Sequence, residues 1–123
     1  MTVAHTPPKA PLLVTRYAID SMTVADQLIT QSALITPTQW QPWAVRTVAE
    51  LTPASLEPVI ALKVSILLLA TGSTALWPDA TLFAHAASHG IGLEVMTLGA
   101  AARTYNLLAS DDRAVLLAVI FAA

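Results

Sequence analysis

The sequence predicts a single α/β domain whose last strand is buried on both faces and lies at the centre of the sheet. Residues 114–121 form an unbroken apolar run, and residues 64–70 form a shorter run that is apolar except for Ser65 and ends before Gly72. Strands that lack polar alternation are covered on both faces, as in parallel sheets. Between these runs, residues 98–109 carry apolar side chains at three- and four-residue steps, the spacing of an amphipathic helix. Helix therefore alternates with strand, which is typical of the α/β class.

The N-terminal segment, residues 1–11, contains three prolines and lacks the apolar core of a secretory signal. We expect it to be a flexible tail, followed by one domain over residues 12–123. A chain of 123 residues is close to the commonest size of a single domain, so one domain is expected.

The first half of the domain predicts strands and a loop. Residues 17–35 indicate two strands joined by a turn near Ala25 and Asp26, although no Asn-Gly pair marks that turn. Prolines interrupt the segment that follows, which places Trp40 and Trp43 in a loop.

The second half alternates strands with helices. A strand, a helix and a parallel strand in succession form a βαβ unit with a right-handed crossover. The predicted elements are a helix that starts at Thr52-Pro53, a strand over 64–70, a helix over about 78–89 that Gly90 ends, a strand over 92–96, a helix over 98–109 and a strand over 114–121.

Composition excludes several classes of function. The chain has no cysteine, which excludes disulfides, thiolate metal sites and thiol chemistry. Its six lysines and arginines form no cluster, and a nucleic-acid partner needs a basic stripe. No apolar run approaches the roughly 20 residues of a membrane-spanning helix. We therefore expect a cytoplasmic protein without a membrane span and without a nucleic-acid partner.

The low charge has two interpretations. Charged residues make up 11% of the chain, against about 25% in a typical domain. One interpretation is an exposed apolar patch that contacts a protein partner or a second copy of the chain. The other is compositional, since 23 residues are alanine, which is common on helix surfaces.

A candidate crevice follows from the predicted strand order. The strands over 64–70 and 92–96 are expected to be parallel neighbours, and ligands of open α/β sheets bind outside the carboxyl ends of the strands. Two helix N-termini would face this crevice and favour a small anion. The alternative is that the glycine only permits a turn and the hydroxyl groups only cap a helix. The candidate residues are Thr71, Gly72, Ser73, Thr74, Trp77, Met96, Thr97, Arg103 and Asn106.

Arg103 has two predicted roles. It lies off the apolar face of its helix, and a helical side chain leans towards the helix N-terminus, so its guanidinium can reach the rim of the crevice. There it could bind a carboxylate or phosphate. Alternatively, it forms an ion pair with Glu94, Asp79 or Asp111 that only orients the helix.

The sequence supports no metal site, cofactor or catalytic group. His85 and His89 stand four residues apart on one predicted helix, a spacing that can clamp a metal, but no third ligand lies near them in sequence. His89 in the last helical turn also has a simpler role in compensating the helix dipole. Ser73 and Ser88 lack the context of a nucleophile elbow.

Seven segments spread along the domain match the pattern of a known family: Ser32 to Pro37, Trp43, Ala70 to Gly72, Trp77-Pro78, Gly90 to Met96, Ala100 to Asn106 and Arg113 to Ile120. Together they resemble the MTH-nine-three-eight-like family of small domains, whose relatives include mitochondrial complex I assembly factor three and an adipogenesis-associated protein. The resemblance covers nearly everything after residue 12, and its most specific part is Ala100 to Asn106.

The resemblance implies a three-layer fold around a mixed five-stranded sheet, with the last strand central and antiparallel to the rest. It implies no established catalytic activity. The chain departs from the family at Ala70, where a glycine is usual, and at Ala102, where a cysteine is common. Two functions therefore stay open: a non-catalytic binding or assembly module that contacts proteins, and a protein that binds a small molecule or anion in the crevice.

Overall fold

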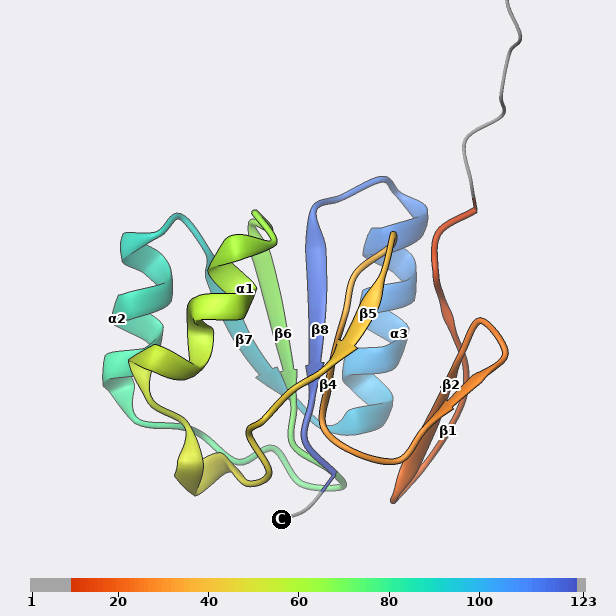
Figure 1. The fold of residues 1–123 in the computed structure, drawn as a ribbon, viewed down its shortest axis with the longest axis horizontal. Coiled ribbons are helices and arrows are strands. Elements are labelled where there is room, and N and C mark those ends of the chain that lie inside the picture. The colour runs from red at the N-terminus through yellow and green to blue at the C-terminus, as the bar shows by residue number, and fades with distance from the viewer. Residues whose placement is uncertain (1–9, 122–123) are drawn as a thin grey trace, which may run out of the picture.

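A five-stranded sheet forms the middle of the protein in the computed structural model, which describes residues 10–121 (Figure 1). The strand order is β5-β4-β8-β6-β7. The strands are β4 (Ala33–Ile35), β5 (Trp40–Pro42), β6 (Ile66–Ala70), β7 (Gly92–Met96) and β8 (Val115–Val119).

The last strand, β8, is central as predicted, but its direction corrects one expectation. β8 is antiparallel to β4 on one side and parallel to β6 on the other, so it is not antiparallel to the rest of the sheet. The reason lies in α3 (Leu98–Ser110), which starts after the carboxyl end of β7 and returns the chain to the end of the sheet where β7 began. A strand that follows such a helical crossover starts at the same end of the sheet as the strand before it, and is therefore parallel to that strand.

Elements cover both faces of the sheet and give the fold three layers (Figure 1). One face packs against α3 and a small antiparallel sheet with the order β1-β2-β3. The other face packs against α1 (Glu57–Ala61) and α2 (Ala80–Ser88), with a short 3-10 helix over Pro53–Leu56 before α1. The strands of the small sheet are β1 (Val14–Ala18), β2 (Ser21–Val24) and β3 (Gln27–Ile29).

The side chains of β8 contribute to two cores. Val115, Leu117 and Val119 pack with α3 and the small sheet, whereas Leu116 and Ala118 pack with α1 and α2. All five side chains are buried. This confirms that the strand is uniformly apolar because both of its faces are covered.

The first part of the domain contains more strands than the sequence predicted. Residues 14–35 form four short strands, where two were expected. The predicted turn is confirmed: Ala25 and Asp26 both have positive φ, 46° and 70°, as in a two-residue type I′ hairpin turn. Trp40 was wrongly placed in a loop, because it begins β5. Pro42 is tolerated there since β5 lies at the edge of the sheet.

The predicted helices and later strands are confirmed with small shifts at their ends. Pro53 begins a 3-10 turn before α1, and Thr52 N donates to Ser55 Oγ at 3.0 Å. α2 starts two residues later than predicted because Asp79 caps it, with its carboxylate accepting from Thr81 N at 2.9 Å. The predicted tail falls mostly outside the described residues. None of the helices within residues 10–121 is long and apolar enough to span a membrane.

Candidate functional site

The carboxyl ends of β6 and β7 meet at one edge of the sheet, as the candidate crevice requires (Figure 1). Ala70 pairs with Met96 at the ends of the two strands. Beyond them, Thr71 N donates to Met96 O at 3.2 Å, and Leu98 N donates to Gly72 O at 2.7 Å. The two loops that the sequence predicted to be neighbours are therefore bonded to each other.

Thr71 braces its own loop. It is 2% exposed, its hydroxyl donates to Thr74 O at 2.7 Å, and the same oxygen accepts from Leu76 N at 2.8 Å. Gly72 follows with a φ of +86°, a conformation that L side chains rarely adopt. Thr71 and Thr74 thus shape the loop, and the buried Thr71 hydroxyl is already bonded within it.

Both helix N-termini near the crevice are capped by groups of the protein itself. At the start of α3, Thr97 Oγ1 accepts from Ala100 N at 3.4 Å, while Gly72 O accepts from Leu98 N. At the start of α2, Asp79 accepts from Thr81 N, and this backbone hydrogen bond lowers the pKa of the Asp79 carboxyl. Several amide groups that would attract an anion are therefore bonded, and a carboxylate already lies at one of the two ends.

A hollow of about 330 Å³ opens beside Gly72, between the α3 N-terminus and the tip of the β1–β2 hairpin. We call it the hairpin hollow. Three of the predicted crevice residues, Gly72, Ser73 and Thr97, line it. The remaining lining residues are Tyr17, Ala18, Ile19, Leu98 and Gly99.

Arg103 reaches the hairpin hollow through Tyr17. Its Nη1 donates to the Tyr17 hydroxyl oxygen at 3.2 Å. Gly99 permits this approach, because a Cβ there would lie 2.9 Å from Tyr17 Oη and 3.3 Å from Arg103 Nη1. Asp79, one of the predicted ion-pair partners, caps α2 instead. The guanidinium thus supports a wall of the hollow.

The other predicted residues do not line the hairpin hollow. Asn106 binds the backbone of Val14, with both hydrogen bonds at 2.8 Å, so it attaches β1 to α3. Trp77 is 68% exposed, and its ring stacks on Phe83 with 5.8 Å between centroids. Met96 contributes its carbonyl to the loop contact described above.

His85 on α2 and His89, the C-cap residue of that helix, form a close pair. The rings of His85 and His89 lie 4.8 Å apart, and His89 Nδ1 lies 3.1 Å from His85 O and 3.2 Å from Ser88 Oγ. Within residues 10–121, no group of three or more histidine, cysteine, aspartate or glutamate side chains could hold a metal ion.

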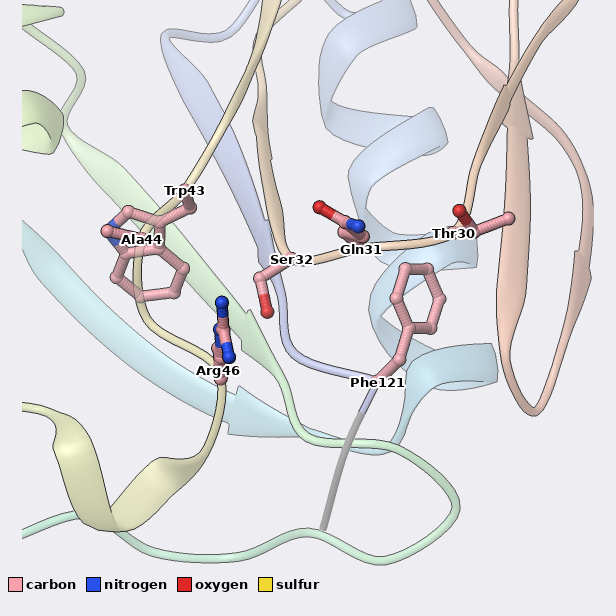
Figure 2. A pocket seen from close by; sticks show the side chains of 7 residues that line it. All are labelled: Thr30, Gln31, Ser32, Trp43, Ala44, Arg46 and Phe121. Atoms are coloured by element: carbon pink, nitrogen blue, oxygen red, sulfur yellow. The ribbon is translucent and has the colours of Figure 1, made fainter.

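A second hollow, which the sequence did not predict, lies on the other side of the β8 carboxyl end (Figure 2). We call it the Arg46 hollow; its volume is about 500 Å³. Its residues come from three separate segments, and Phe121 lies far from the other two in sequence, so no local spacing could reveal the hollow. Its lining residues are Thr30, Gln31, Ser32, Trp43, Ala44, Arg46 and Phe121.

The comparisons with known proteins place the chain in a family. The family described as "Protein of unknown function (DUF498/DUF598)" matches residues 14–120. The chain belongs to the DUF498/DUF598 family. The match spans every strand and helix described above. The chain matches no protein with a curated description.

Solved structures share the fold of this DUF498/DUF598 protein. A Xanthomonas campestris protein is 35% identical with a TM-score of 0.85, over 98% of this chain and 92% of that one. A Bordetella parapertussis protein is 28% identical with a TM-score of 0.85, over 93% and 98%. A Bordetella pertussis protein described as a Mth938-like domain is 23% identical with a TM-score of 0.80, over 98% and 92%. The Mth938-like fold that the resemblance implied is confirmed.

Proposed function

We propose that this domain is a non-catalytic binding module that contacts a protein partner through the hairpin hollow. The observation that carries the proposal is the exposure of Tyr17 and Ile19, 44% and 71%, on the wall of that hollow. Large apolar side chains that flank a concave surface are typical of contact sites.

The chemistry of the hairpin hollow suits an apolar partner segment. None of its eight lining residues carries a charge. Full burial of a side chain such as Ile19 contributes about 1.5–3 kcal/mol, and Tyr17 adds an aromatic ring of the kind enriched at interface hot spots. The Arg103 guanidinium bonds to the Tyr17 hydroxyl, which orients the ring before a partner arrives. A preoriented side chain loses less conformational entropy on binding.

The pKa shifts of two groups have structural causes, which favours a binding function over a catalytic function. Burial raises the pKa of Tyr105, whose hydroxyl donates to Leu12 O at 2.7 Å and so holds the N-terminal segment. The lowered pKa of Asp79 results from capping α2. Neither group lines the hairpin hollow, whereas shifted groups of an enzyme gather in its cleft.

A photocrosslinking experiment tests the proposal. A benzophenone amino acid replaces Ile19 in one variant and Leu107 in a matched control, since the two side chains are 71% and 70% exposed. Expressed in the native host, the position-19 variant should form a discrete crosslinked protein adduct that the position-107 variant lacks. Equal adducts from both positions, or none from position 19, would refute the proposal. Mass spectrometry of the adduct distinguishes a second copy of the chain from another protein.

A further inference from the structure

The Arg46 hollow is built where β8 ends and β4 begins. Ala33 pairs with Val119 in the antiparallel β4–β8 ladder, so Ser32 and Phe121 flank the same edge. Trp43 follows the edge strand β5 and is held beside Ser32, since Trp43 N donates to Ser32 O at 2.9 Å. Figure 2 shows Trp43 and Phe121 on opposite sides of the Ser32 and Arg46 side chains.

Ser32 presents a hydroxyl group to this hollow. The residue is only 8% exposed, yet its hydroxyl has no hydrogen-bond partner within residues 10–121, and it points into the hollow (Figure 2). No fully enclosed polar side-chain atom in the described residues lacks a partner, so this hydroxyl is reached from the hollow. A buried polar group of this kind needs a partner from a ligand or water.

Arg46 gives the hollow a single positive charge. Its backbone N–H donates to Glu50 Oε1 at 3.2 Å, which fixes the backbone beside the hollow. The guanidinium lies beside the Ser32 hydroxyl in the view of Figure 2, and none of the seven lining side chains is acidic. A guanidinium binds a planar carboxylate through two parallel hydrogen bonds.

We propose that the Arg46 hollow binds a small organic monocarboxylate with an aromatic body. One positive charge balances one carboxylate, whereas a phosphate monoester carries nearly two negative charges at neutral pH. The Ser32 hydroxyl donates to a carboxylate oxygen, and Phe121, which is half-buried, offers a ring for the aromatic body. The volume of about 500 Å³ suits a small organic molecule.

The Trp43 indole closes the other side of the site. Its Nε1 donates to Ser55 O at 3.2 Å, so its ring orientation is fixed before any ligand enters. Trp43 is 7% exposed, and its indole N–H is already bonded to Ser55 O, so it is not free to bind a ligand in the hollow. Specific recognition therefore depends on Arg46 and Ser32, while the aromatic side chains limit the shape of the ligand.

An NMR titration with phenylacetate tests this site, with the neutral 2-phenylethanol as the matched probe. Phenylacetate should shift the backbone amide signals of Ser32, Arg46 and Phe121 in a saturable way, and 2-phenylethanol should bind at least about tenfold more weakly because it lacks the charge-assisted hydrogen bonds. Arg46→Gln should weaken phenylacetate binding about tenfold or more, and Ser32→Ala about threefold to tenfold. Arg103→Gln, at the hairpin hollow, should leave the affinity unchanged.

Three results would overturn the inference. The first is equal affinity for the neutral probe. The second is unchanged phenylacetate affinity in Arg46→Gln, a variant expected to fold normally because Arg46 is exposed. The third is tighter binding of inorganic phosphate than of phenylacetate at the same ionic strength, which would assign the hollow to a different class of anion.

Discussion

The Asn106 side chain forms a hydrogen-bonded pair with the backbone of Val14, 92 residues earlier in the chain. Its Oδ1 accepts from Val14 N and its Nδ2 donates to Val14 O, each at 2.8 Å. One amide thus takes the place that a neighbouring strand would occupy beside β1. This contact holds the small sheet against α3, and it positions the hairpin that carries Tyr17 and Ile19.

Replacing Asn106 should loosen this attachment. Asn106→Ala leaves both backbone groups of Val14 without their partner, and we expect a loss of about 1–3 kcal/mol in the free energy of unfolding. Asn106→Asp should cost at least as much at neutral pH, because a carboxylate oxygen would then face Val14 O. Urea denaturation measures the loss, and hydrogen exchange should show reduced protection of the Val14 amide. The neighbouring Leu107→Ala serves as the control, since Leu107 is 70% exposed. Equal stability of Asn106→Ala and Leu107→Ala would contradict the role given to Asn106.

Leu117→Asp should abolish folding. Leu117 is fully buried at the middle of β8, and an unpaired carboxylate there has no compensating partner. Circular dichroism and heteronuclear NMR should show an unfolded or aggregated chain. Leu107→Asp, with the same substitution at an exposed position, should fold. A soluble Leu117→Asp protein that melts cooperatively would contradict the burial of β8 on both faces.

The strands and helices of the second half could be predicted because their burial leaves a local pattern. β6 and β8 are covered on both faces and therefore have continuous apolar sequences, and α3 has a clear apolar face. The prediction that β8 is antiparallel to the rest of the sheet was wrong, because α3 returns the chain so that β8 runs parallel to β6. Neither hollow could be predicted in full: the Arg103–Tyr17 bond joins residues 86 positions apart, and Ser32 meets Phe121 only because β4 pairs with β8.

Gly99→Ala tests two opposing effects: alanine has the higher helix propensity, but its methyl group would contact Tyr17. Alanine is favoured over glycine in a helix by about 1 kcal/mol, but the new methyl group would lie 2.9 Å from Tyr17 Oη. The Tyr17 side chain can swing away, so the variant should fold, with altered Tyr17 ring signals in NMR spectra. In a Tyr17→Ala background the same substitution should stabilise the protein by about 0.5–1 kcal/mol. A smaller gain there than in the wild-type background would contradict the close approach of Tyr17 to Gly99.

The cap on α2 should make stability depend on pH. The hydrogen bond from Thr81 N lowers the pKa of Asp79 in the folded protein. A carboxyl group with a lowered folded pKa contributes stability above its unfolded pKa, and this contribution is lost as the pH falls through the folded pKa. Asp79→Ala should therefore melt at a lower temperature than the wild type at neutral pH, and the difference should shrink in acid. A difference that stays constant down to the pH where the carboxyl is protonated would show that its charge has no part in the cap.

Arg103→Ala should change the stability of the protein little, but it should measurably alter the tip of the β1–β2 hairpin. Arg103 is exposed, so water competes for its bond to Tyr17 Oη at 3.2 Å, and we expect a loss of less than about 1 kcal/mol in the free energy of unfolding. Tyr17→Phe removes the same bond from the other side while it keeps the aromatic ring. If the bond is the only role of Arg103, the two variants should shift the same hairpin amide signals, and the double variant should show no further shift.

A large fall in melting temperature for Arg103→Ala that Tyr17→Phe does not reproduce would show that Arg103 stabilises α3 through a different contact. Loss of the position-19 crosslink in both variants, at an unchanged melting temperature, would link the orientation of Tyr17 directly to partner binding.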